Sequence, residues 1–85
     1  MGIDEEAVDR SLLGEGRYAN YFEVGHNVFE FVLDFGQGGR EREPIRIYVR
    51  IITTPEGAAT LSRLLEDALR KYRKMFGPIQ GDENS

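Results

Sequence analysis

The sequence predicts an α+β domain: a three-stranded antiparallel meander followed by one long C-terminal amphipathic helix that packs on one sheet face. Two patterns support this fold class. Apolar residues occupy every second position over residues 28–35 and 45–53, as in strands with one buried face. Over residues 55–76 the apolar residues recur at helical spacing instead.

The predicted strands span residues 17–25, 28–35 and 45–53. In the second and third strands, the alternate positions form two apolar rows. These rows are Phe29, Phe31, Leu33 and Phe35, and then Ile45, Ile47, Val49 and Ile51. Residues 36–44 are a polar, glycine-containing loop between these strands.

A two-residue turn at His26 and Asn27 is predicted to join the first two strands, because Asn tolerates the positive φ that tight hairpins require. This turn would pair Val24 with Phe29. The resulting register places the apolar residues of both strands on one face of the sheet.

The helix over residues 55–76 is bounded by clear signals. Thr54 is an N-cap residue and Pro55 suits the first helical turn, whereas Gly77 ends the helix. At about 1.5 Å per residue the helix is about 33 Å long, so it overhangs an eight-residue strand of about 27 Å. Its apolar residues, which fall in one arc of roughly 140°, are Ala58, Leu61, Leu64, Leu65, Ala68, Leu69, Tyr72, Met75 and Phe76.

Residues 17–78 therefore make one β-β-β-α domain. Residues 1–16 carry five acids and one Arg, and we expect them to be a flexible acidic N-terminal arm. Residues 79–85 are expected to be a disordered tail.

The length of 85 residues makes the hydrophobic core of this domain small, supplying only about 3–5 kcal/mol. The chain has no Cys and one His, so neither a disulfide nor a zinc site is expected to add stability. Self-association remains as the expected source of added stability. We therefore expect the first partner to be the protein itself, in a homodimer or higher oligomer.

The formal net charge of -4 argues against nucleic acid as the main partner. No apolar run approaches the roughly 20 residues that a membrane span needs. The acidic start does not resemble a signal peptide. The protein is therefore expected to be cytoplasmic and to have no membrane partner.

No set of residues indicates catalysis, a cofactor or a metal. His26 has no second His or Cys to complete a zinc site. Glu30 and Asp34 share a strand face, but Arg46 and Arg50 on the next strand are expected to neutralise them. The glycine loop lacks the Lys-Ser/Thr pair and the following helix of a phosphate motif. We therefore expect a protein that is not an enzyme.

The strongest functional signal is apolar surface that one copy cannot cover. One helix covers one sheet face, while the opposite face carries further apolar residues and the helix continues beyond the sheet. The predicted interface residues are Tyr21, Val28, Val32, Tyr48 and Ile52 on the opposite face, and Tyr72, Met75 and Phe76 near the helix end. The first and third strands also present open edges.

Four segments resemble a prokaryotic family of short proteins of unknown function, found in bacteria and archaea. They are Tyr18-Ala19-Asn20-Tyr21, the strand Glu30 to Phe35, the helix start Thr54 to Ala58, and the apolar series from Leu61 to Gly77. The resemblance covers residues 17–79 and implies no activity, so it supplies no catalytic residues.

The strand pattern is more distantly similar to the export chaperone SecB. That fold places a meander beside a long helix, forms dimers and tetramers, and holds unfolded chains. The present chain is shorter than SecB and lacks most of its helical C-terminal part.

Three functions follow as expectations. The first is a non-catalytic homo-oligomeric protein–protein interaction module. The second is a SecB-like binder of extended or unfolded polypeptide, or of another protein, through Tyr21, Val32, Tyr48 and the open strand edges. The third is a nucleic-acid accessory protein that uses the basic helix face, which comprises Arg63, Arg70, Arg73 and Lys74.

Overall fold

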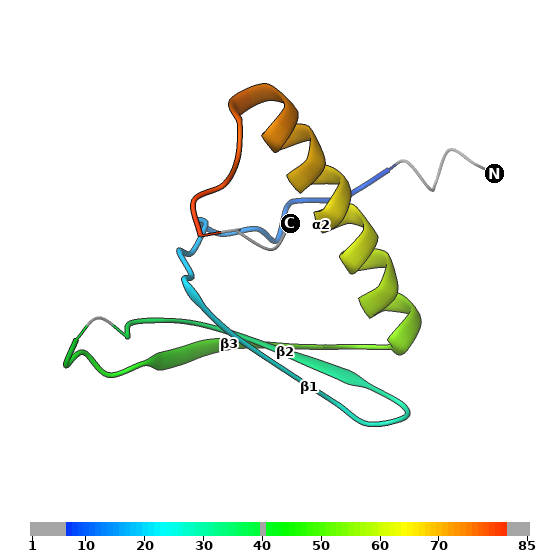
Figure 1. The fold of residues 1–85 in the computed structure, drawn as a ribbon. Coiled ribbons are helices and arrows are strands. Elements are labelled where there is room, and N and C mark those ends of the chain that lie inside the picture. The colour runs from blue at the N-terminus through cyan, green and yellow to red at the C-terminus, as the bar shows by residue number, and fades with distance from the viewer. Residues whose placement is uncertain (1–6, 40, 82–85) are drawn as a thin grey trace.

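The computed structural model describes residues 7–39 and 41–81. These residues form three strands and one helix, in the order β1 (Tyr21–His26), β2 (Phe31–Gln37), β3 (Arg46–Thr53) and α2 (Pro55–Phe76). The strands make one antiparallel sheet in the order β1-β2-β3 (Figure 1). The predicted α+β class and element order are confirmed. Residues 1–6 of the predicted arm and 82–85 of the predicted tail lie outside the described residues.

The hairpin between β1 and β2 has a longer turn than the sequence predicted. The Asn27 side chain accepts hydrogen bonds from the backbone N–H groups of Phe29 and Glu30, at 2.7 and 2.9 Å. The Asn27 N–H also donates to the Glu30 carbonyl at 3.0 Å. The predicted two-residue turn is therefore wrong, because the Asn27 side chain holds a four-residue turn instead.

This longer turn moves the register of the hairpin. Val24 lies opposite Leu33 rather than Phe29. The shift along β2 is four residues, an even number, so each side chain keeps the sheet face predicted for it. Phe29 and Val28 are the exceptions, because they now lie in the turn and are largely exposed.

The β2–β3 hairpin is irregular at its loop end. A register shift separates Phe35, opposite Val49, from Gly36, opposite Ile47. A side chain at Gly36 would collide with the backbone carbonyl of Arg46, so this close approach requires glycine. The glycine loop that follows turns through positive φ at Gly38, Gly39 and Glu41.

Only Thr54 separates β3 from α2. Its backbone is extended, and its hydroxyl accepts a hydrogen bond from the Gly57 N–H at 2.9 Å, which caps the helix as predicted. A side chain at Gly57 would collide with the Thr53 hydroxyl, so the first helical turn lies directly against the end of the strand. The helix ends where Gly77, at φ 96°, donates to the Arg73 carbonyl.

The helix faces the sheet but does not close on it. In Figure 1, α2 starts at the end of β3 and rises away from the sheet. The described residues include no buried apolar side chain, and none of the α2 residues is buried. The helix lies over the predicted face, where its apolar residues from Ala58 to Leu69 line a groove with Val24 and Phe31 without burying any apolar side chain of the described residues.

The shape of the molecule is correspondingly open. The Cα radius of gyration is 16.1 Å, against about 12 Å for a compact domain of this length. The only buried residues in the described ranges are Asp34 and Gly36, both on the central strand. The described residues of a single copy thus form a complete hydrogen-bonded sheet and a complete helix but include no buried apolar side chain.

Candidate interaction surface

One side of the sheet forms an apolar surface, which we call the aromatic face. Residues directly opposite each other on neighbouring strands share a face, so the pairing defines it. Its members are Phe22, Val24 and His26 of β1, Phe31, Leu33 and Phe35 of β2, and Val49 and Ile51 of β3. Phe22 and Phe35 meet edge to face, with ring centroids 5.8 Å apart. The face is organised but stays accessible, since Phe22 and Val24 are more than half exposed.

His26 takes part in this surface. It is the last residue of β1, and its ring stacks on Phe31 with centroids 5.2 Å apart. The described residues contain no group of three His, Cys, Asp or Glu side chains able to hold a metal ion. His26 is therefore placed as an aromatic neighbour of Phe31.

The apolar arc of α2, which we call the helix stripe, is exposed over most of its length. The exposed fraction is 39 % at Leu61, 63 % at Leu64, 47 % at Tyr72 and 75 % at Met75. Leu69 is half-buried. Near the C-terminal end the Tyr72 and Phe76 rings contact each other, with centroids 5.0 Å apart. The stripe is thus most exposed where it lies farthest from the junction.

A groove separates the aromatic face from the helix stripe. Three sheet residues line one wall and mostly apolar helix residues line the other. They are Val24, Phe31 and Leu33, and then Ala58, Leu61, Ser62, Leu65, Glu66 and Leu69. This helix–sheet groove is open to solvent and contains one ionisable side chain, Glu66. Its chemistry suits an apolar occupant.

The opposite face of the sheet carries charged residues at its centre, as predicted for Asp34 and Arg50. A row of charged residues crosses it, because Glu23, Asp34 and Arg50 lie opposite one another on the three strands. Arg50 Nε donates to Asp34 Oδ1 at 2.8 Å and Arg50 Nη2 donates to Asp34 Oδ2 at 2.9 Å. This confirms the predicted pairing of Arg50 with Asp34. Arg46 instead lies opposite Gln37, so the predicted approach of Arg46 to an acidic neighbour is wrong.

The charged groups of this row shift the pKa values of two residues. The hydrogen bonds from Arg50 lower the pKa of Asp34, against a smaller opposing effect of desolvation. The Tyr21 hydroxyl donates to Glu23 Oε2 at 2.6 Å, and this bond to a carboxylate raises the Tyr21 pKa. The centre of the opposite face is therefore an ion-pair surface rather than an apolar one.

Tyr48 is partly covered by the segment that precedes β1. The Arg17 guanidinium lies over the Tyr48 ring, 3.9 Å from its centroid, in cation–π geometry. The Tyr48 hydroxyl oxygen is buried and has no hydrogen-bond partner within the described part of the chain.

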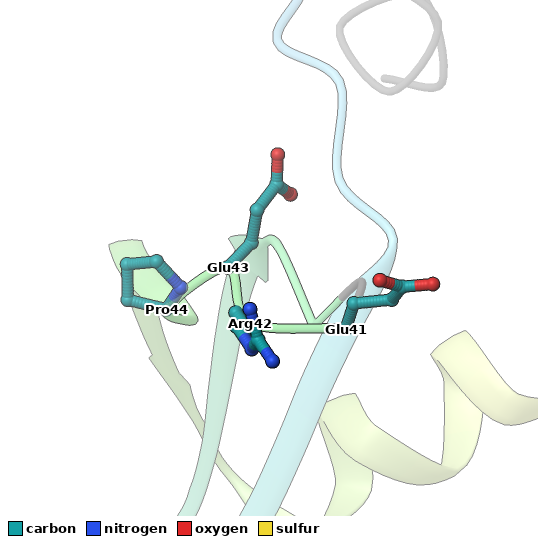
Figure 2. Close-up of a pocket in the computed structure, with 4 residues that line it drawn as sticks. All are labelled: Glu41, Arg42, Glu43 and Pro44. Atoms are coloured by element: carbon teal, nitrogen blue, oxygen red, sulfur yellow. The ribbon is translucent and has the colours of Figure 1, made fainter.

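A surface hollow occurs in the β2–β3 loop. It is lined by four consecutive residues, Glu41, Arg42, Glu43 and Pro44. Figure 2 shows the two Glu side chains pointing in different directions, and none of the four lining residues comes from a helix or strand. A hollow formed by one loop without converging groups does not offer a catalytic constellation.

The basic end of α2 is partly engaged with the helix itself. Arg70 and Lys71 form ion pairs with Asp67 at 2.6 and 3.0 Å, and Arg63 donates to the Thr60 hydroxyl. Such i,i+3 and i,i+4 contacts are typical of a solvated helix surface. The nucleic-acid role of this face stays a prediction.

The eight predicted interface residues fall into three environments. Tyr72, Met75 and Phe76 are exposed on the helix stripe, as predicted. On the opposite face Ile52 is exposed, whereas Tyr21, Val32 and Tyr48 are half-buried. Val28 is not on that face, because the Asn27 turn places it in the hairpin loop.

The prediction missed the aromatic face as a candidate surface. Phe22, Val24 and Leu61 were assigned to a core that the single copy does not form. One signal for this exposure was present in the sequence. The interval between the apolar pattern of β3 and the Pro55 helix start is one residue, shorter than the roughly 2–6 residues usual between a strand and a helix.

A family model described as "Protein of unknown function (DUF3467)" matches residues 3–81. The chain belongs to this family. Searches among curated proteins and among solved structures find no match. The match confirms the resemblance to a family of unknown function and extends it beyond residues 17–79, while the likeness of this DUF3467 chain to SecB stays a prediction.

Within the described residues of the DUF3467 chain, no helix combines the length and apolar character needed to cross a membrane.

Proposed function

We propose that this DUF3467 protein is a non-catalytic homo-oligomeric protein–protein interaction module. The observation that supports this is the lack of any buried apolar side chain among the described residues. Burial of apolar surface is the main favourable term in folding. A chain whose strands and helix are fully formed but whose aromatic face and helix stripe are exposed therefore requires a partner surface.

Much of the exposed area is apolar surface that a second copy could cover. One copy exposes 7930 Å², against about 5,100 Å² for a compact monomer of the same mass. Part of this excess lies on the segment 7–20, which is almost entirely exposed. Another part lies on the aromatic face and the helix stripe, where Phe22, Val24, Met75 and Phe76 are each more than half exposed.

Light scattering coupled to size exclusion tests the proposal on the full chain over a dilution series. We expect a mass of at least two chains that persists at micromolar concentration. A monomer with a cooperative thermal unfolding transition under the same conditions would refute the proposal, because it would show that one copy is stable alone.

A second candidate function is binding of extended polypeptide by strand addition. The observation that favours it is the sheet order, in which the outer edges of β1 and β3 have no neighbour within the described structure. Such edges form backbone hydrogen bonds with an added strand. A peptide array, followed by an assay of aggregation suppression with an unfolded client protein, tests it. Absence of binding to every peptide and client would rule this function out.

A further inference from the structure

We infer that the helix–sheet groove is occupied by the α2 helix of a second copy, with the two α2 helices antiparallel. This inference rests on the proposed homo-oligomeric function and assigns its contact surface. The surface is the aromatic face with the helix stripe, and not the opposite sheet face.

The first step of the argument is that α2 cannot fill the groove of its own chain. Thr54 is the whole connection between β3 and α2, and it is held by the cap hydrogen bond to Gly57. Gly57 in turn lies against Thr53 without room for a side chain. The direction of the helix is therefore fixed at its first turn, and Leu64, Met75 and Phe76 on its apolar arc stay more than half exposed.

The second step is that the chain carries both halves of the contact. The aromatic face lacks a covering apolar helix, and the helix stripe lacks a covering apolar sheet. Two copies related by a two-fold axis can cover both surfaces at once, because the helix of each copy packs on the aromatic face of the other. The exposed members of both surfaces, Phe22 and Val24 on the sheet and Leu64 and Met75 on the helix, are the side chains that such a contact would bury.

The third step is charge, which sets the relative direction of the two helices. From Pro55 to Asp67, α2 contains three acidic residues and one basic residue, whereas residues 68–76 contain four basic residues and no acid. Parallel helices would bring the two basic ends together. Antiparallel helices place each basic end beside the acidic half of the partner helix, which is the favourable arrangement.

Disulfide trapping between chains tests this contact, since the protein contains no native Cys. One chain carries Leu61→Cys, Leu65→Cys or Leu69→Cys on the helix stripe. The other chain carries a different tag and Val24→Cys on the aromatic face. In the matched control the second chain carries Ile52→Cys, which is exposed on the opposite face. Each pair is refolded together and oxidised mildly.

We expect a disulfide-linked heterodimer for at least one helix position with Val24→Cys, and its loss with Ile52→Cys. Using three helix positions keeps the test valid if one variant fails to fold. A dimer by light scattering that links only through Ile52→Cys, or through neither sheet position, would overturn this inference and leave the proposed function intact. A monomer would overturn both.

The relative direction of the two helices is tested by whether a variant with one Cys forms a disulfide with a second copy of itself. In an antiparallel pair, a residue of one helix lies close to the same residue of the partner helix only near the point where the two helices cross. We expect Leu64→Cys or Leu65→Cys, near the helix centre, to form a homodimeric disulfide and Met75→Cys to form none. A Met75→Cys homodimer would show that the helices are parallel.

Discussion

Asp34 is the most constrained charged side chain in the described structure. It is buried on the central strand, and both of its carboxylate oxygens accept hydrogen bonds from Arg50. These bonds lower the pKa of Asp34 in the folded chain below the value it has when unfolded. The unfolded chain therefore binds the proton first as the pH falls.

From this difference we predict that the free energy of unfolding falls as the pH decreases from about 5 through the lowered pKa of Asp34. Above that window the contribution is fully present. Chemical denaturation of the parent chain and of Asp34→Asn across this pH range measures it. The dependence should be weaker in Asp34→Asn, and equal dependence in the two proteins would contradict the assignment.

Individual contacts were predictable where strand alternation alone decides them. The spacing of Asp34 and Arg50 on neighbouring strands was sufficient to predict their pairing. The position of Arg46 was not predictable in the same way, because it depends on the register shift between Phe35 and Gly36 at the loop end of the β2–β3 hairpin. The register of β1 on β2 was set separately, by hydrogen bonds from the backbone to the Asn27 side chain, and an even shift leaves the alternating pattern unchanged.

The helix was the most predictable element, because its ends depend on local chemistry. The predicted range 55–76 equals the observed one, with Thr54 as the cap and Gly77 at positive φ. The start of β1 was less predictable. The predicted strand begins at residue 17, whereas β1 begins at Tyr21, although the Asn20 N–H already donates to the Gly36 carbonyl.

The Thr54 cap provides a prediction for α2. Replacing Thr54 by Ala removes the acceptor of the Gly57 N–H and should lower the free energy of unfolding by about 1 kcal/mol, within a range of about 0.5–2 kcal/mol. Thr54→Ser keeps the hydroxyl and is the matched control. Chemical denaturation at fixed protein concentration provides the measurement, and equal stability of the two variants would argue against the cap.

The arrangement of helix and sheet was the least predictable feature of the protein. The apolar patterns of both were correct, and they predicted a helix packed on one face. Periodicity shows which face is apolar but does not show how closely the helix of the same chain covers it. That coverage depends on the backbone direction at Thr54, a single residue whose conformation the pattern does not encode.

The length of this connection yields a prediction for the assembly. Inserting Gly-Ser-Gly between Thr53 and Thr54 should let α2 reach back onto its own aromatic face, because short connections favour exchange between copies and longer ones relieve it. We expect the mass measured by light scattering to fall to that of a monomer. The same insertion between Glu41 and Arg42, in the β2–β3 loop, should leave the mass unchanged. A dimer that survives the first insertion would contradict this account.

Because α2 joins the sheet only through Thr54, a small rotation at its first turn displaces its far end by a large distance. Its length of about 33 Å means that a rotation of about 10° at its base moves its far end by about 6 Å. A small torsional change at the last residues of β3, without loss of any ladder hydrogen bond, would therefore carry Met75 and Phe76 across a distance comparable to the width of a side chain. Any influence on this end of the sheet, whether twist or a bound strand, is amplified into the position of the far end of α2.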